Sequence, residues 1–578
     1  MSLRVCLVTP FAWSQPHSVN EHVQGVAGQL RTLGHAVTVL APSNRARDLI
    51  AGRRALQTGA NADVIAVGPA VPVSRRSHMG VPVGVRANLA LALAEGRFDV
   101  VHGFEPGLPS LSYLALRDAQ SLSVASFFSP ERLAYPPGRG QRERLLTRTD
   151  ALIASSPETA AAAAARFPGD YRLLSEGIDL DRFRPGRKRK LIVAEWRPNA
   201  RPSARSLTRT LRELDHWELV FVRTRSTFGR PFIPRALVGR AHTRTLASGE
   251  SRASLMAEAA IFVPAAEGLP RLRLEAAAAG AALAEPPGVL EQPELSGAAV
   301  ARLAEDQGYR EQEAAKARAW AEEQSFERVA AELNELYQGL STRRREPKRA
   351  SGDPLAGRPW ILADLHMHTN WSSDCQTPVA ELLDHAEAEG LGAIAITDHN
   401  AIGGALEANE LANGRELIVI QGEEVKTDAH GEVIGLFLEQ EIPRGLPFAE
   451  TIEAIRAQGG LVYLPHPFDR VHTIPDPATV HRHLADIDVL EVYNARLLFE
   501  AYNDEALRFA RKYGLTMGAG SDAHVLQGVG TGAVRMRAFE GPEDFLISLR
   551  SAEIVRRPRS LLYLQSLKWA AQAKERVR

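Results

Sequence analysis

The sequence of 578 residues predicts a multidomain α/β protein. Short apolar runs, which suit buried parallel strands, alternate with helix patterns along most of the chain. In the C-terminal part, histidines and carboxylates follow several of these runs, at the strand ends where a β/α barrel carries its chemistry. A basic, proline-containing stretch at residues 341–358 has the composition of a linker between the two parts. At about 100–200 residues per domain, we expect three domains or so.

Composition excludes several classes of protein. Lysine plus arginine equal aspartate plus glutamate at 69 each, so no overall charge favours nucleic acid or an anionic membrane. Two cysteines, Cys6 and Cys375, cannot form a disulfide framework and suit a reducing compartment. Residues 1–9 lack the layout of a signal peptide, and no run of about 18 apolar residues is present. We therefore expect a cytoplasmic protein without a membrane span, and the alanine and arginine bias is typical of GC-rich bacterial coding.

The first 340 residues contain two sets of strand candidates separated by helix patterns. We interpret them as two Rossmann-like halves, which would bind a nucleotide-type ligand in the cleft at the carboxyl ends of their strands. The candidates are Val5–Thr9, Ala36–Leu40, Asp99–His102, Ser123–Phe127 and Ala151–Ala154 in the first set, and Lys190–Ala194, Glu218–Val222 and Ala260–Pro264 in the second.

Five polar motifs in the last two-fifths of the chain each close an apolar run. Residues i and i+2 of a strand project to one face, so His366 and His368 can chelate one ion. Imidazole and carboxylate ligands without clustered thiolates suit catalytic Zn²⁺, Mn²⁺ or Fe²⁺. There are more candidate ligands than one ion needs, which predicts two or three ions that activate a hydroxide and hold a phosphoryl group. The motifs are Asp364–Thr369, Thr397–His399, Gly422–Glu424, Pro465–Pro467 and Ser521–His524.

Residues 359–560 resemble the PHP (polymerase and histidinol phosphatase) family of metal-dependent phosphoesterases through these motifs. The resemblance implies a distorted seven-stranded barrel with a trinuclear centre. We expect a metal-bound hydroxide to attack phosphorus and a site histidine such as His399 or His466 to assist the leaving group, with His524 as a further catalytic candidate. The substrate would be a phosphate mono- or diester, such as a nucleotide, a sugar phosphate or a short nucleic acid. The implied ligands are His366, His368, Asp374, His399, Glu424, His466, Asp522 and His524.

Some assignments within this segment stay open at the level of the sequence. Asp374 follows the first motif with one residue more than the usual spacing in the family. Where the family often has a histidine, this chain has Glu432, with His430 just before it. Either of the two could be a ligand, or neither. Glu423 competes with Glu424, but adjacent strand residues face opposite sides, so only one of them can enter the site.

Other polar residues of this segment have weaker claims to a role. Lys426, Arg470 and Arg496 are the candidates for contacting phosphate, although a solvated basic side chain is the commoner explanation for each. Glu491 and Asn494 end another strand candidate and are suitably placed to support ligands from behind. Cys375, beside Asp374, is more consistent with an incidental position than with a ligand.

The segment from Arg4 to about Leu340 resembles family 4 glycosyltransferases of the GT-B fold. The resemblance runs through Gly34–Pro42, Phe98–His102, Gly177–Asp179, Phe183–Pro185 and the helix pattern from Phe326 to Tyr337. Its most specific element is a pair of glutamates separated by seven residues. In that family the pair holds the sugar and ribose of a nucleotide-sugar, and basic residues grip the diphosphate. The residues implied here are Glu267, Glu275, Arg197 and Arg201.

The same segment departs from the family at several positions. Pro16-His17-Ser18 replaces a glycine-rich turn, and Phe127 and Phe128 occupy the place of a histidine that contacts the transferring sugar. Pro270 removes a backbone donor from the turn after Glu267. We therefore expect a GT-B scaffold whose transferase activity is weakened or lost.

The sequence predicts a phosphoesterase tethered to a glycosyltransferase-like module. Two alternatives remain: a bifunctional transferase and phosphoesterase of one glycoconjugate pathway, or a module that senses a nucleotide-sugar and regulates the phosphoesterase. The predicted segments are residues 1–180 and 181–340 for the GT-B halves, 341–358 for the linker, 359–560 for the PHP barrel and 561–578 for a C-terminal helix or tail.

Overall fold

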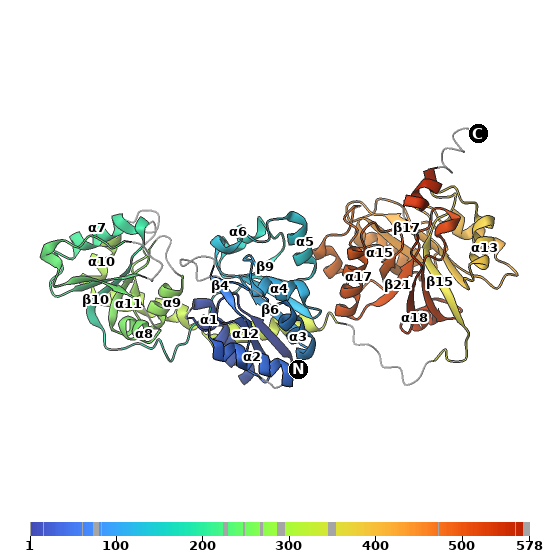
Figure 1. Ribbon diagram of the computed structural model, residues 1–578. Coiled ribbons are helices and arrows are strands. Elements are labelled where there is room, and N and C mark those ends of the chain that lie inside the picture. Colours follow the sequence, from blue (N-terminus) through green and yellow to red (C-terminus); the bar gives the residue numbers. More distant parts are fainter. Residues whose placement is uncertain are drawn as a thin grey trace. The chain divides into compact units, whose positions relative to one another are not determined.

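The structure, a computed structural model shown in Figure 1, divides into two units, Met1–Gly339 and Leu340–Arg578. Among the described residues, no helix has both the length and the apolar character needed to span a bilayer. The described residues are 2–15, 17–59, 62–72, 80–82, 84–223, 229–246, 249–265, 270–285, 295–344, 354–471, 473–560 and 562–569.

The first half of the N-terminal unit is a parallel sheet of seven strands in the order β3-β2-β1-β6-β7-β8-β9. The strand order reverses beside β1, as in a doubly wound fold. All five predicted strands are present, and β3 and β9 extend the sheet at its two edges. The strands are β1 (Arg4–Val8), β2 (Ala36–Pro42), β3 (Val64–Gly68), β6 (Val100–Phe104), β7 (Leu122–Phe127), β8 (Ala151–Ala154) and β9 (Tyr171–Leu173), with a small antiparallel pair, β4 (Ala70–Pro72) and β5 (Gly80–Pro82).

The helices between these strands give the alternating α/β pattern that the sequence predicts. Phe127, where the resemblance expects a histidine nearby, ends β7 and packs in the buried core of this half. The helices are α1 (Ser18–Thr32), α2 (Ala46–Thr58), α3 (Arg86–Gly96), α4 (Leu111–Asp118), α5 (Arg139–Thr147) and α6 (Pro157–Ala164).

The second half of this unit is a parallel sheet of five strands in the order β12-β11-β10-β13-β14. All three predicted strands of this half are present as β10, β11 and β13. The strands are β10 (Arg189–Glu195), β11 (Glu218–Arg223), β12 (Ala241–Thr245), β13 (Ala259–Val263) and β14 (Ala282–Leu283). The helices are α7 (Arg201–Thr210), α8 (Gly249–Glu258), α9 (Pro270–Ala278), α10 (Ser296–Glu305) and α11 (Gln307–Glu322).

The last helix of the unit, α12 (Phe326–Ser341), returns to the first half. Its Tyr337 is fully buried, and the hydroxyl lies 2.6 Å from Nδ1 of His102 in β6. Asn334 Oδ1 lies 3.0 Å from Nε2 of His35. These contacts join the end of the unit to its beginning across about 300 residues.

The C-terminal unit is built on a sheet of nine strands in the order β21-β20-β19-β18-β17-β16-β15-β22-β23. Strands β15 to β21 follow one another in chain order, and β21 returns to β15, where Asp522 N donates to His366 O at 2.7 Å and His368 N donates to Ala523 O at 3.0 Å. The predicted seven-stranded distorted barrel is therefore confirmed. The strands are β15 (Trp360–Met367), β16 (Ala393–Ile396), β17 (Ile418–Lys426), β18 (Glu432–Leu436), β19 (Leu461–Leu464), β20 (Val489–Asn494) and β21 (Thr516–Gly520).

Two features of the barrel differ from a plain β/α repeat. Strand β18 pairs antiparallel with both β17 and β19. Two further strands, β22 (Gly532–Arg537) and β23 (Glu553–Arg556), extend the sheet antiparallel from β15, and the sequence did not predict them. The helices are α13 (Val379–Ala388), α14 (Gly403–Leu411), α15 (Phe448–Ala457), α16 (Pro477–Arg482), α17 (Glu500–Tyr513) and α18 (Pro542–Leu549).

Alternation along β15 separates the core of the barrel from the polar residues. Ala363 and Leu365 belong to the main apolar cluster of this unit. Asp364 and His366 point to the other face, because successive strand side chains alternate. The first motif thus supplies apolar packing and polar ligands from one strand.

Candidate metal centre

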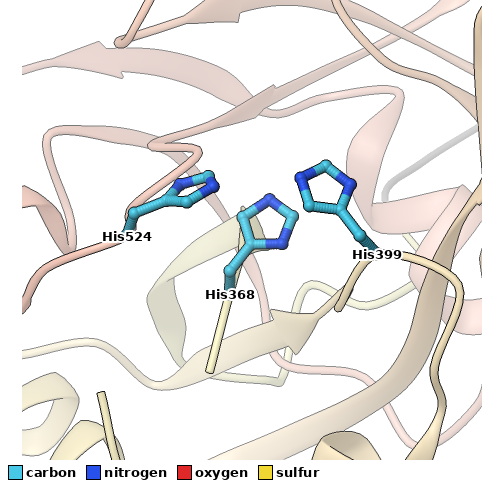
Figure 2. Close-up of side chains that lie close together, drawn as sticks. All are labelled: His368, His399 and His524. Atoms are coloured by element: carbon cyan, nitrogen blue, oxygen red, sulfur yellow. The ribbon is translucent and has the colours of Figure 1, made fainter. Parts of the chain in front are cut away.

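The predicted ligands converge at one end of the C-terminal barrel. His368 follows β15, His399 follows β16 and His524 follows β21, and their three rings face one another (Figure 2). The ring centroid of His368 lies 4.4 Å from that of His399 and 4.3 Å from that of His524. Strands β15, β16 and β21 therefore place imidazoles within reach of a common ion.

Four groups of three side chains have ligand atoms within 4.8 Å of one another. The groups overlap, because His366, His368, His399 and Glu424 each belong to two of them. Overlapping groups suit neighbouring ions that share ligands. The groups are His368, His399 and His524; His366, Glu424 and His466; His366, His368 and Asp522; and His399, Glu424 and Glu432.

Glu424 lies at the centre of the cluster. Its Oε2 is 3.1 Å from Nδ1 of His399 and 3.3 Å from Nε2 of His366. Its Oε1 is 3.0 Å from Nε2 of His466. The side chain is almost fully buried, so this carboxylate faces imidazole nitrogens and not water. Glu424 would therefore be a ligand of an ion held by this cluster.

Asp522 and Asp374 complete the cluster on the other side. Oδ1 of Asp522 lies 3.3 Å from Nε2 of His368. Oδ2 of Asp374 lies 2.9 Å from Nε2 of His524, and Oδ1 lies 3.9 Å from Nε2 of His399. Asp374 thus reaches the site in spite of its longer spacing in the sequence. All of the residues predicted as ligands lie in this one cluster.

The structure separates the pairs that the sequence left open. Glu423, buried next to Glu424, turns away and accepts a hydrogen bond from Ile442 N at 2.8 Å. Glu432 lies 3.8 Å from Nδ1 of His399, within the cluster. His430 instead pairs with Asp476, with Nδ1 and Oδ2 3.3 Å apart. Glu424 and Glu432 are therefore the carboxylates of this region that face the site.

Burial and close charges shift the pKa values of the cluster strongly. Burial lowers the pKa of His366, but the carboxylates of Glu424, Glu491 and Asp522 outweigh it and raise that pKa well above its usual value. Burial raises the pKa of Glu424, but His366 and His399 hold it well below its usual range. These shifts show a buried site in which carboxylates need cations beside them.

Residues behind the cluster hold the ligands in place. Glu491 Oε1 lies 3.0 Å from Nδ1 of His366 and accepts a hydrogen bond from the hydroxyl of Tyr463 at 3.0 Å. Its Oε2 accepts from the backbone N of His466 at 2.7 Å. Asn494 donates to Glu491 at 3.0 Å. Glu491 and Asn494 thus have the supporting position that the sequence suggested, and they orient the imidazoles.

Two aspartates of the motifs bond neighbouring loops and are not members of the ligand groups. Asp364 accepts hydrogen bonds from Ser521 N and Gly530 N, both at 2.9 Å, and so ties β15 to the loop after β21. Asp398 accepts from the backbone N and the hydroxyl of Thr369, both at 2.6 Å. Asp364 and Asp398 both lie within the sequence motifs, but only the structure shows which groups donate hydrogen bonds to them.

The donor set fits divalent metal ions. Nε2 of His368 is buried and has no hydrogen bond among the described residues, although Asp522 Oδ1 is near, and such an orphaned nitrogen suits coordination. His466 and Asp522 have positive φ angles of 26° and 52°, a sparsely populated conformation that clusters at functional sites. Cys375 directs its thiol to the carbonyls of His368 and His524, so it is not a member of the donor set.

Models of three known protein families match parts of the chain. The family "Glycosyltransferase Family 4" matches residues 19–182, the family "PHP domain" matches residues 364–512 and the family "PHP-associated" matches residues 500–554. The chain joins a family 4 glycosyltransferase domain to a PHP domain.

Individual proteins resemble one part of the chain each. Uncharacterized protein MJ0417 of Methanocaldococcus jannaschii is 33% identical over 215 residues, which are 35% of this chain and 85% of that protein. A phosphatidyl-myo-inositol mannosyltransferase of Propionibacterium freudenreichii is 33% identical over 184 residues, which are 31% of this chain and 47% of that protein. The chain thus spans about half the length of that mannosyltransferase. Among solved structures, sucrose-phosphate synthase from Thermosynechococcus elongatus is similar with a TM-score of 0.40 and 14% sequence identity. The superposition covers 58% of this chain and 99% of that synthase chain.

Two cations lie at the Asp374 side of the PHP domain's cluster. Arg496 Nη1 is 3.1 Å from Asp522 Oδ1 and 3.0 Å from Nδ1 of His524, so this candidate phosphate contact does reach the site. Lys426 is exposed. Lys568, which the sequence did not single out, lies 2.7 Å from Asp374 Oδ2. No motif surrounds Lys568, so no sequence signal could have found it.

Two of the four donor-binding residues predicted for the glycosyltransferase domain, Glu275 and Arg197, form ion pairs within the protein. Glu275, in α9, is fully buried, with its two oxygens 3.0 Å from Arg252 Nε and 3.2 Å from Arg271 Nε. Arg197 pairs with Glu195 at 3.0 Å. Arg201 begins α7 and is exposed. Glu267 lies outside the described residues.

Proposed function

We propose that the PHP domain hydrolyses a phosphate mono- or diester with two or three divalent ions, Mn²⁺, Zn²⁺ or Fe²⁺. The observation that carries this proposal is the set of overlapping ligand groups around Glu424. A single ion needs about four protein ligands or fewer, whereas this cluster offers at least twice as many donor side chains. The proposed ligands are His366, His368, Asp374, His399, Glu424, His466, Asp522 and His524, with Glu432 as an addition.

Bound divalent ions would acidify a water molecule and neutralise the oxygens of a phosphoryl group. The protein's own residues prepare the site for that chemistry. Glu491, 3.0 Å from Nδ1 of His366, holds that imidazole so that Nε2 faces the cluster. Burial of Glu424 and Asp522 keeps water from competing for their oxygens.

A histidine of the cluster that is protonated and not bound to an ion would carry the proton to the leaving oxygen. Proton delivery to a substrate needs access, and the side chain of His399 is 25% exposed, compared with 11% for His466 and 3% for His524. We assign this role first to His399 and then to His466. His524, though part of the same sequence prediction, is the least accessible.

A panel of phosphomonoesters and phosphodiesters, assayed with Mn²⁺, Zn²⁺ and Mg²⁺, tests this function. The panel should include nucleotides, sugar phosphates and short oligonucleotides. We expect hydrolysis that depends on the added ion and stops on chelation. Absence of metal-dependent hydrolysis across the whole panel, with a folded protein that contains metal, would reject the proposal.

For the glycosyltransferase domain we propose binding of a nucleotide or nucleotide-sugar without efficient sugar transfer. Phe127 and Phe128 are buried where the family has a histidine near the sugar, and losing a positioned group of that kind typically costs about 100-fold or more in rate. The two arginines beside Glu275 also compete with any ligand for that carboxylate.

Calorimetry and a transfer assay on the full chain separate the alternatives. We expect a measurable binding isotherm for a nucleotide or nucleotide-sugar, weakened in Glu275→Ala, with little transfer to any acceptor. Robust transfer would instead support a bifunctional enzyme. A ligand that binds without turnover and changes the rate of phosphoester hydrolysis would support a sensing module.

A further inference from the structure

The helix at residues 562–569 places a lysine against the metal cluster. Nζ of Lys568 lies 2.7 Å from Oδ2 of Asp374, the same oxygen that lies 2.9 Å from Nε2 of His524. The lysine side chain is 11% exposed. It lies beyond residue 554, where the match to the PHP-associated segment ends. Lys568 therefore lies outside the matched segments, whereas its partner Asp374 lies inside the PHP match.

Lys568 is the most deeply buried residue of the helix at residues 562–569. Of residues 562–569, Lys568 alone is buried, whereas Leu562 is 86% exposed and Trp569 is 63% exposed. Helices usually dock through an apolar face. Leu564 and Leu567 are half-buried, but the most buried residue of this helix is the charged Lys568, and lysine is almost never buried unless it is paired. The position of Lys568 thus calls for an electrostatic role at the cluster.

A second cation lies at the same corner of the cluster. Arg496 Nη1 is 3.1 Å from Asp522 Oδ1 and 3.0 Å from Nδ1 of His524. Divalent ions held by Asp374 and Asp522 would share those carboxylates with Lys568 and Arg496. The corner would then carry ions and two fixed cations, an arrangement that attracts an anion. A phosphoryl group supplies both the charge and the acceptor oxygens.

We propose that Lys568, together with Arg496, binds the non-bridging oxygens of the substrate's phosphoryl group at this corner. This inference rests on the proposed phosphoesterase function and adds a binding residue to it. An ammonium group has three N–H donors. One of them stays directed at Asp374 and the others are available to the phosphoryl group. The helix at 562–569 would thus complete the substrate site from outside the barrel.

The test uses Lys568→Gln in the full chain loaded with Mn²⁺, and inorganic phosphate as the probe. By calorimetry we expect phosphate to bind about 10-fold more weakly, the loss expected for a charge-assisted hydrogen bond. KM for the best phosphoester should rise by a similar factor, kcat should change less, and metal content should be unchanged. Lys568→Arg should retain most of the affinity, because the charge remains.

Arg559→Gln is the matched control, because it also removes a cation from the C-terminal segment. Arg559 is 40% exposed and pairs with Glu389 at 3.6 Å, so this variant should bind phosphate like the wild type. Unchanged phosphate affinity in Lys568→Gln would overturn the inference. A higher kcat would show a blocking role, and loss of metal would show a purely structural one; both overturn it.

The two proposals fail in distinguishable ways. A wild-type protein that hydrolyses no phosphoester would reject the phosphoesterase, while the phosphate titration still measures the contribution of Lys568. Active wild-type protein with no phosphate binding, or with equal binding in Lys568→Gln, would reject the role of Lys568 alone.

Discussion

At the scale of single residues, the adjacent pair Glu423 and Glu424 gives the sharpest test of the metal centre. Glu424→Gln removes a carboxylate that lies between three histidines, so we expect at least about a 100-fold loss of kcat/KM together with lost metal. Glu423→Gln should keep both, because that side chain faces the backbone of Ile442. Metal analysis and hydrolysis rates check the pair, and equal behaviour of the two variants would contradict the site.

Gly520 controls the position of His366. A Cβ at residue 520 would lie 2.3 Å from Cβ of His366 and 2.9 Å from its backbone N, so the strand must move. We expect Gly520→Ala to lower metal content and hydrolysis, even though no ligand is removed. Gly357→Ala is the control, because nothing lies within 4 Å of the added atom. Full metal content in Gly520→Ala would show that His366 tolerates displacement.

Glu105 should make the stability of the glycosyltransferase domain depend on pH. Burial raises its pKa from 4.5 to about 7, although Arg132, 3.0 Å away, opposes this. Between these values the folded state binds more protons than the unfolded state, so stability falls as the pH rises through that window. We expect the free energy of opening to fall by about 1 to 3 kcal/mol between pH 4.5 and 7 relative to Glu105→Gln.

Hydrogen exchange of the β6 amides at several pH values measures that difference. The comparison with Glu105→Gln removes the ordinary dependence of exchange on pH, because both proteins share it. Parallel curves for the two proteins would mean that Glu105 ionises in the folded state as easily as in water.

At the scale of elements, α12 stabilises the glycosyltransferase domain by docking Tyr337. The pKa of His102 is lowered to about 3 by burial and by His22, so its imidazole is neutral and bonds both Tyr337 and Ser126, at 2.6 and 2.7 Å. Tyr337→Phe should cost about 1–3 kcal/mol, because a buried nitrogen loses its partner. Tyr337→Ala should cost about 3–5 kcal/mol, because a cavity is added.

Urea unfolding of this domain measures both costs. Tyr563→Phe is the control, since Tyr563 is 49% exposed and lies in the other unit. If Tyr337→Ala were no worse than Tyr337→Phe, packing of α12 would contribute little and the hydrogen bond would account for the docking.

At the scale of the whole molecule, the PHP domain should work by itself. All proposed ligands, Glu491 and Lys568 lie within the unit Leu340–Arg578. We expect the fragment 354–578 to fold, to bind more than one ion per chain by elemental analysis, and to hydrolyse the same esters as the full chain. A folded fragment that stays metal-free in metal-supplemented medium would contradict the multinuclear centre.

The sequence predicted much of this architecture because its signals are local. Continuous apolar runs specify buried strands whatever surrounds them, and polar motifs that close such runs lie at strand ends. Alternation along a strand also showed, without tertiary information, that only one of Glu423 and Glu424 can enter the site. The structure showed that Glu423 is the one that turns away. Strands β22 and β23 escaped prediction because Gly532–Arg537 and Glu553–Arg556 carry charged residues and lack a long apolar run.

The sequence by itself determined that a GT-B module precedes a PHP barrel and that histidines and carboxylates follow the strands of that barrel, because each depends on residue type and short spacing. Only the tertiary structure decided which side chains share a ligand group, that Glu432 and not His430 faces the cluster, and that Arg496 and Lys568 meet at one corner. Those outcomes depend on distances between residues as far apart as Asp374 and Lys568, and only the closed barrel and its docked C-terminal helix set such distances.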